Sequence, residues 1–392
     1  MKLNLLFLPC AVLLQVAVAM GAENLPSLLT KVVPSSPAAI LRRPSIVFIE
    51  CHGLGAEDLS CYGQTNYQTP NLDRLAASGI KFTGYQVGMP GNCPATAALL
   101  SGKNETDIPD QNNLASLLNQ AGYRTGCIGE WNPGSLPWER GFNEFAGFLD
   151  DNEGRNYYAD YFWRYTPDFF YNKTLGQWTE WKPKDGPNTG GKEVIFDNLA
   201  GKKGRYMPDE LFHWAANFVR NNEPDKFNHF RPFFLLVNLP APRTATPGMD
   251  DFPVPTDAPF TGESWPQAAK NRAALVVRLD SGVGRFLEQL GKSRLTNNLA
   301  LFFTGLNTPE KFADTNLARI FHPTQPNKVP MILHWPGQLP ERHTSDVAWT
   351  AADFAPTVLD IALIKPILPF AGTSVLPLLS GKTTRRGGVE KP

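Results

Sequence analysis

The sequence carries no surplus of either charge. Its 392 residues include 37 Lys+Arg and 37 Asp+Glu, which excludes the strongly basic surface typical of a nucleic-acid-binding protein. It contains no internal repeat and no low-complexity block. Beyond the N-terminus it has no apolar run long enough to cross a bilayer. These absences favour a globular chain with one large α/β domain or two ordinary ones.

The long apolar run at the N-terminus has the pattern of an export signal. Lys2 supplies a positive charge, residues 3–18 are largely apolar, and Ala17-Val18-Ala19 fits a small-residue cleavage site. We therefore expect a signal peptide over residues 1–22 and an exported protein, in the periplasm, outside the cell or in the secretory pathway. An uncleaved membrane anchor is the alternative.

Cysteine is scarce, with five residues in the chain. Cleavage of the signal peptide would remove Cys10 and leave Cys51, Cys61, Cys93 and Cys127. An even number of cysteines in an exported chain permits disulfides, but the spacing does not reveal the pairing. Buried free thiols are the alternative.

Short apolar runs alternate along the chain between strand-like and helix-like patterns. Strands are expected at residues 45–49, 80–83, 123–128, 232–239, 299–303 and 329–333. Helices are expected at residues 70–78, 97–100, 114–121, 209–221, 267–290 and 353–363. Uniformly apolar strands that alternate with helices are typical of a mostly parallel sheet covered by helices on both faces.

This pattern also divides the chain. Residues 23–44 are rich in Pro and Ser and are predicted to be a linker, residues 45–381 an α/β domain, and residues 382–392 a basic tail. Within the domain, residues 150–207 are aromatic, Gly-rich and Lys-rich, and are predicted to form a long surface excursion. Sites in such folds form at the carboxyl ends of the strands. Those ends are expected at residues 50–53, 91–94, 129–132, 240–243 and 304–307.

Several stretches, in this order, resemble the secreted sulfatases of the alkaline phosphatase superfamily. The matching stretches are residues 43–49, 58–63, 69–83, 97–103, 120–125, 231–235, 278–280 and 329–337. The resemblance implies an alkaline-phosphatase-like α/β fold over the domain. Members of that family continue into a small C-terminal sheet, whereas here residues 376–382 are followed only by the basic tail. That sheet is therefore expected to be absent or missing from this chain.

The resemblance places the nucleophile in the loop before residue 97. Active sulfatases share a Cys-x-Pro-x-Arg motif whose Cys is oxidised to formylglycine, and the hydrate of formylglycine attacks sulfur. In this sequence Asn92 stands at the Cys position and Thr96 at the Arg position. A one-residue gap would bring Cys93 to the Cys position, but Thr96 would still replace the Arg. Cys93 can act as a nucleophile only as a thiolate.

The family's calcium positions are changed as well. Two adjacent Asp of the family correspond to His52 and Gly53, and a later Asp-Asn pair corresponds to Leu306 and Asn307. Calcium prefers several oxygen ligands, mostly carboxylates. Because Asn307 alone keeps a suitable oxygen, calcium binding is expected to be lost, and no cofactor is expected.

The positions that contact sulfate in the family also differ. The Lys and His of a Gly-Lys-Trp-His element correspond to Glu130 and Asn132, and a further His corresponds to Arg243. A later Lys aligns loosely with Arg319. Glu130 would repel a sulfate ester, which leaves Arg243 and Arg319 to bind an anion. The alternative is that both arginines serve only surface solubility.

Three functions remain open from the sequence. The first is a non-catalytic sulfatase relative that binds a sulfated glycan or a partner protein. The second is an active sulfuric-ester hydrolase, which the family resemblance alone would suggest. Function, however, depends on the residues of the site rather than on the fold. The third is a repurposed metal site, in which Cys51, His52, Cys93 and Cys127 converge from strand ends to bind zinc. A disulfide between Cys51 and Cys93 is the alternative to this metal site.

Overall fold

The computed structural model describes most of the predicted α/β domain. The described residues are 43–87, 95–103, 108–166, 168–172, 177–181, 190–223, 231–245, 251–306, 328–366 and 368–380. The predicted signal peptide, the predicted basic tail and nearly all of the predicted linker lie outside these ranges. No helix within them combines the length and the apolarity that crossing a bilayer requires.

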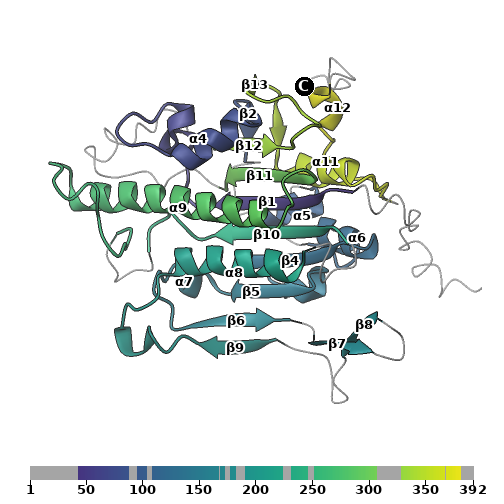
Figure 1. Ribbon diagram of the computed structural model, residues 1–392, viewed down its shortest axis with the longest axis horizontal. Coiled ribbons are helices and arrows are strands. Elements are labelled where there is room, and N and C mark those ends of the chain that lie inside the picture. Colours follow the sequence, from purple (N-terminus) through teal and green to yellow (C-terminus); the bar gives the residue numbers. More distant parts are fainter. Residues whose placement is uncertain are drawn as a thin grey trace, which may run out of the picture.

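A ten-stranded sheet forms the centre of the described part of the chain (Figure 1). Its strand order is β13-β2-β12-β11-β1-β10-β4-β5-β6-β9. In chain order these strands are β1 (Ser45–Cys51), β2 (Ile80–Phe82), β4 (Arg124–Glu130), β5 (Glu144–Phe148), β6 (Tyr161–Tyr165), β9 (Gly191–Val194), β10 (Phe233–Leu239), β11 (Leu299–Gly305), β12 (Met331–His334) and β13 (His343–Ser345). Two small sheets pair β3 (Tyr85–Gln86) with β14 (Trp349–Thr350), and β7 (Asp168–Asn172) with β8 (Gln177–Trp181).

The middle of the large sheet is parallel, as the sequence predicted. Strands β11, β1, β10, β4 and β5 run in the same direction. Beside them, β12 runs antiparallel to β11, β6 runs antiparallel to β5, and β9 pairs antiparallel with β6. Strands β1, β10 and β11 are buried along their whole length. Their burial on both faces explains why the sequence shows continuous apolar runs instead of alternation.

Helices cover both faces of the sheet (Figure 1). One apolar core lies under α4, α8 and α9, and the other lies under α5, α6 and α11. These helices are α4 (Pro70–Ala77), α5 (Ala95–Ser101), α6 (Leu114–Gln120), α8 (Met207–Asn221), α9 (Gln267–Lys292) and α11 (Phe354–Ile361). Two short helices are α7 (Asp151–Gly154) and α12 (Leu376–Leu379). The predicted mostly parallel sheet with helices on both faces is confirmed.

The element ends differ from the predictions by a few residues. The strand expected at residues 123–128 continues to Glu130, and the helix expected at residues 267–290 continues to Lys292. Thr69 precedes α4 as expected, but its side chain does not cap the helix. The Thr69 hydroxyl contacts the Ser60 hydroxyl instead, at 2.8 Å. Local sequence signals therefore predict the positions of helices and strands more accurately than they predict the contacts at the ends of these elements.

The prediction of a surface excursion over residues 150–207 is wrong in part. Strands β6 and β9 from this segment extend the central sheet. The rings of Tyr157, Tyr158 and Phe162 are buried, and Phe162 stacks on Trp214 of α8 with 4.2 Å between ring centroids. The aromatic residues that suggested an irregular surface loop instead provide the apolar area that holds these added strands in place.

The contact between β4 and β5 leaves no room for a side chain at Gly147. We expect Gly147→Ala to lower the free energy of unfolding by about 3 kcal/mol, because the added Cβ would lie 1.8 Å from the Gly129 carbonyl oxygen. Urea denaturation measures this loss. Gly191→Ala on β9 is the matched control, since its Cβ would meet nothing within 4 Å. Equal losses in the two variants would contradict the described contact.

Candidate functional site

A row of polar side chains crosses the central strands near their carboxyl ends. The sheet register places Glu50 of β1 beside Asn238 of β10 and beside Thr304 of β11. All three are almost completely buried, on the face of the sheet that α5 covers. A polar row in an otherwise apolar sheet must satisfy its hydrogen bonds within the protein.

Thr96, at the position of the family's Arg, closes this row from α5. Its hydroxyl donates to Glu50 Oε1 at 2.9 Å, and it accepts a hydrogen bond from Asn238 Nδ2 at 3.3 Å. The Thr96 side chain is 3% exposed. Thr96 therefore forms hydrogen bonds with buried side chains and does not supply the positive charge that an Arg would bring to this position. Asn92 and Cys93, the two candidate nucleophile positions, lie outside the described residues.

Glu50 is a site residue that the sequence analysis did not single out. It is 0% exposed, and its Oε2 has no hydrogen-bond partner among the described residues. Burial raises the pKa of Glu50 to about 8, and the negative charge of Glu130 adds to this effect, while the hydrogen bond from Thr96 opposes it. Glu50 is therefore mostly protonated at neutral pH. An acidic residue inside an apolar strand was the sequence signal that could have identified it.

The described family calcium positions do not fit a calcium ion. His52 Nε2 donates to Asn238 Oδ1 at 2.8 Å, and burial lowers the pKa of His52 to about 3, with a further effect from the Arg243 charge. Gly53 has no side chain, and Leu306 is apolar and uses its backbone N–H to bond the Cys51 carbonyl at 2.9 Å. A neutral imidazole and two positions without side-chain oxygens are not the ligands that calcium prefers. Asn307 lies outside the described residues.

Glu130 and Arg243 form a buried ion pair across two strand ends. Arg243 Nη2 donates to Glu130 Oε2 at 2.5 Å, and the two side chains are 10% and 0% exposed, respectively. Glu130 Oε1 accepts from Asn132 Nδ2 at 2.5 Å. Burial raises the pKa of Glu130 to about 6, and the Arg243 charge opposes this rise.

Arg243 also bonds a second carboxylate. Its Nη1 donates to Asp151 Oδ1 at 2.9 Å. Arg243 is therefore not an unpaired cation in the described structure, because its guanidinium already faces two acids. Anion binding at this position stays a prediction. The alternative of a surface-solubility role is wrong, because the side chain is largely buried. Arg319 lies outside the described residues.

Arg272 of α9, which the sequence analysis missed, holds the loops around these positions together. Its guanidinium donates to the Pro242 carbonyl at 2.6 Å and to the Gly53 carbonyl at 3.0 Å. It also forms a buried ion pair with Asp58 at 2.7 Å. A Cβ added at Gly53 would lie 3.0 Å from Arg243 Cα. The loops after β1 and β10 are therefore held in close contact by side chains from this chain.

The proposed convergence of Cys and His residues is not supported within the described ranges. Cys51 belongs to the core under α8 and α9, whereas Cys127 belongs to the core on the opposite face. Both thiols are free and buried, and burial raises the pKa of each. No group of three or more metal-binding side chains occurs among the described residues. Cys51 is free in the described structure, so the alternative of a disulfide between Cys51 and Cys93 is not supported.

Comparison with known proteins identifies the family. Residues 44–364 match the family model for sulfatases. The chain belongs to the sulfatase family. An N-acetylgalactosamine-6-O-sulfatase of Bacteroides thetaiotaomicron is 26% identical over 331 residues, which cover 68% of this chain and 59% of that protein. Arylsulfatase A of Homo sapiens is 27% identical over 386 residues, which cover 89% of this chain and 70% of that protein.

Solved structures agree with this assignment. The crystal structure of Ps i-CgsB in complex with k-i-k-neocarrahexaose has a TM-score of 0.63 and 25% identity, and the match covers 86% of this chain and 76% of that chain. The predicted sulfatase resemblance and the predicted alkaline-phosphatase-like fold are therefore confirmed. The changed residues at the strand ends lie on a sulfatase-family fold.

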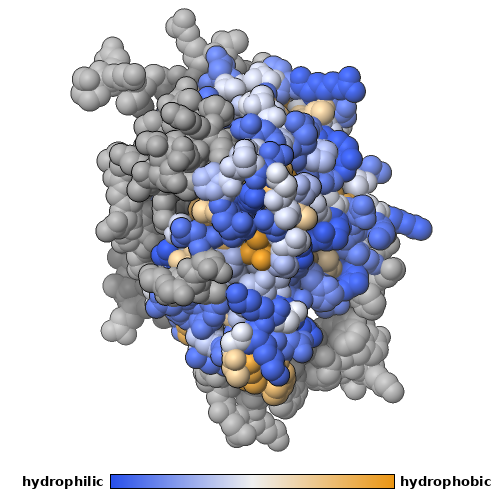
Figure 2. All heavy atoms as spheres, turned by 90° about the vertical axis from the view of Figure 1, so that its left-hand side faces the viewer, coloured by the Kyte–Doolittle hydropathy of each residue, from blue (hydrophilic) through white to orange (hydrophobic). Residues whose placement is uncertain are grey.

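The carboxyl edge of the parallel strands is mostly hydrophilic on its described surface. In Figure 1 the carboxyl end of β10 points to the left-hand side, and Figure 2 shows the molecule from that side. Small apolar areas appear near the centre and at the lower end of this view. This face of the sulfatase-family domain therefore shows no broad apolar patch among the described residues that would indicate a hydrophobic partner.

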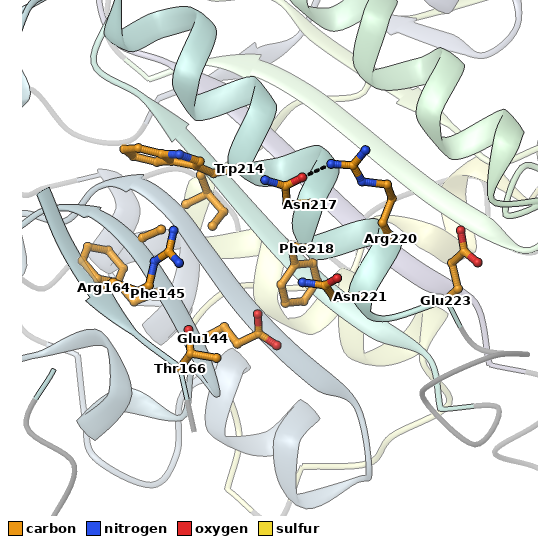
Figure 3. A pocket seen from close by; sticks show the side chains of 12 residues that line it. Glu144, Phe145, Arg164, Thr166, Trp214, Asn217, Phe218, Arg220, Asn221 and Glu223 are labelled. Atoms are coloured by element: carbon orange, nitrogen blue, oxygen red, sulfur yellow. Dashed lines mark hydrogen bonds between the residues drawn. The ribbon is translucent and has the colours of Figure 1, made fainter. Parts of the chain in front are cut away.

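A separate pocket of about 610 Å³ lies between α8 and strands β5 and β6 (Figure 3). Its lining includes two acids and two arginines: Glu144, Glu223, Arg164 and Arg220. Glu144, at the amino end of β5, pairs with an arginine of β4 at 2.9 Å, and Glu223 accepts from a serine hydroxyl at 2.7 Å. The pocket lining reaches Ile128 of β4 but does not include Glu130, the last residue of that strand. Because the lining carries both acids and arginines, the pocket favours neither an anionic nor a cationic ligand.

The buried Glu50 side chain should make stability depend on pH. Its pKa is raised in the folded state, so its contribution to stability is fully present below pH 4.5 and is lost as the pH rises to about 8. We expect the free energy of unfolding of the wild type to fall more steeply between pH 5 and pH 8 than that of Glu50→Gln. Urea denaturation at several pH values measures both slopes, and parallel slopes would contradict a protonated Glu50.

Proposed function

We propose that this chain is an exported, non-catalytic member of the sulfatase family. The observation that carries the proposal is the Glu130–Arg243 ion pair. In active relatives the resemblance assigns cations to both positions, where they contact sulfate. Here an acid and a base at these positions neutralise each other, so the pair lacks the net positive charge that attracts a sulfate ester.

The other family positions support the same proposal. Hydrolysis by the family's mechanism needs a formylglycine nucleophile, and the sequence has no Cys-x-Pro-x-Arg motif around Asn92 and Cys93. It also needs a metal ion, and the donors at His52 and Gly53 do not suit calcium. Thr96 replaces the motif's Arg and bonds Glu50 in the core. These changes take away the nucleophile and the metal ligands and place an acid, Glu130, where the family has a cation.

The proposed role is binding of a sulfated glycan or a partner protein. Several sulfatase relatives are named for sulfated sugars, and one similar solved structure holds an oligosaccharide named k-i-k-neocarrahexaose. The retained fold supports a binding role, because cores and strand order persist where catalytic groups do not. Export is proposed from the signal-peptide pattern in residues 1–22, and the domain division at residues 23–44, 45–381 and 382–392 is part of the same proposal.

An active sulfuric-ester hydrolase is the competing function, and the names of the relatives favour it. That function needs Cys93 to be converted or to react as a thiolate. Family membership alone does not supply those groups.

Hydrolysis of a generic aryl sulfate separates the two functions. The exported form is co-expressed with a formylglycine-generating enzyme and assayed with calcium, beside an active sulfatase as a positive control. We expect no turnover above the uncatalysed rate and an unmodified Cys93 by intact-mass analysis. Turnover that disappears in Cys93→Ala would show that the loop supports a nucleophile and that the non-catalytic proposal is wrong.

A further inference from the structure

The two carboxylates bound to Arg243 lie in very different environments. Glu130 is 0% exposed and belongs to β4, whereas the Asp151 side chain is 52% exposed and begins the short helix α7. Asp151 also lies 3.6 Å from Arg155, four residues further along the chain. Asp151 is therefore the outer partner of Arg243, and Glu130 is the inner one.

This difference makes the outer contact the easier one to exchange. A half-exposed carboxylate recovers its hydration when it leaves an arginine, so such pairs add little to stability. A buried carboxylate such as Glu130 cannot leave without losing its partner in a region of low polarity. If Asp151 moved away, Arg243 would thus remain bonded to Glu130, and its Nη1 group would be available to another anion.

The Arg243 guanidinium is suited to such an exchange. Its side chain is 10% exposed, so an anion that reached it would be largely removed from water, where charge-assisted hydrogen bonds are strong. Its Nε is buried, and its Nη2 already bonds Glu130 at 2.5 Å. The Nη1 group, which now bonds Asp151, is therefore the part of the guanidinium that an exchange would make available.

We propose that Asp151 occupies, within the chain, the place of an oxyanion ligand at Arg243. The site is an oxyanion site that its own α7 keeps filled, and it accepts an external oxyanion when Asp151 is displaced. This inference rests on the proposed function in one respect, because it concerns the binding that remains once hydrolysis is lost. It adds a regulatory contact that the family positions do not include.

The charges around the site agree with this arrangement. Asp150 and Glu153 lie in or beside α7, and Glu130 lies below it, while Arg155 adds one positive charge nearby. Asp151 places a negative charge directly against Arg243, which opposes the approach of an anion. Removing the Asp151 charge both frees a guanidinium N–H group and reduces this repulsion.

Isothermal titration calorimetry with sodium sulfate at constant ionic strength tests the proposal. We expect Asp151→Asn to bind sulfate roughly tenfold more tightly than the wild type, because the binding-competent state no longer competes with an internal carboxylate. The gain should disappear in the double variant Asp151→Asn, Arg243→Met. Circular dichroism of each variant shows whether it is folded.

Asp197→Asn is the matched control. Asp197 is an exposed acid that pairs with Arg205 at 2.8 Å on another part of the surface. Its loss changes the net charge equally but leaves Arg243 unchanged. An equal gain in sulfate affinity in Asp197→Asn would overturn the proposal, as would no gain in Asp151→Asn or a gain that persists without Arg243.

These outcomes are independent of the hydrolysis assay. Turnover of an aryl sulfate by the wild type would overturn the non-catalytic function without bearing on the Asp151 contact. If Asp151→Asn binds sulfate no more tightly than the wild type, the proposed role of Asp151 is wrong. The proposal of a non-catalytic function is unchanged by that result.

Discussion

A carboxylate that is fully removed from water requires a partner charge or a proton, and Glu130 has its partner in Arg243 at 2.5 Å. This requirement joins the end of β4 to the loop after β10. That loop contacts Gly53 after β1, and Arg272 binds carbonyls of both loops. Internal side-chain contacts therefore connect strand ends that the sulfatase resemblance assigns to a metal ion and a substrate.

Glu50 meets the same requirement by a different route. No described cation contacts it, and burial raises its pKa to about 8, so it keeps a proton at neutral pH. Its hydrogen bond from Thr96 leads through Asn238 to His52, which burial keeps neutral. The region thus combines one ion pair with a row of uncharged polar groups. Such a region lacks both a free cation cluster and a carboxylate set for calcium within the described residues.

Sequence patterns predicted the parallel centre of the sheet, but they predicted neither the added strands β6 and β9 nor the partners within the site. Continuous apolar runs revealed the buried parallel strands, because burial on both faces leaves no alternation to detect. The resemblance assigned Glu130 and Arg243 to family site positions, and that assignment stays a prediction. Their contact was not foreseen, because the two residues are 113 positions apart and meet only through the strand order. The contact of Arg243 with Asp151 depends on α7, which lies in the segment predicted to be a long surface excursion.

A double-mutant cycle on unfolding tests the central ion pair most directly. Urea denaturation would compare the wild type, Glu130→Gln, Arg243→Met and the variant with both changes. We predict that each single change lowers the free energy of unfolding by about 3 kcal/mol, and that the double change costs about 2 kcal/mol less than the sum of the two. Single-variant losses that add to within about 0.5 kcal/mol would contradict the account. In that case, Glu130 and Arg243 would act independently, and the site would remain open to an anion.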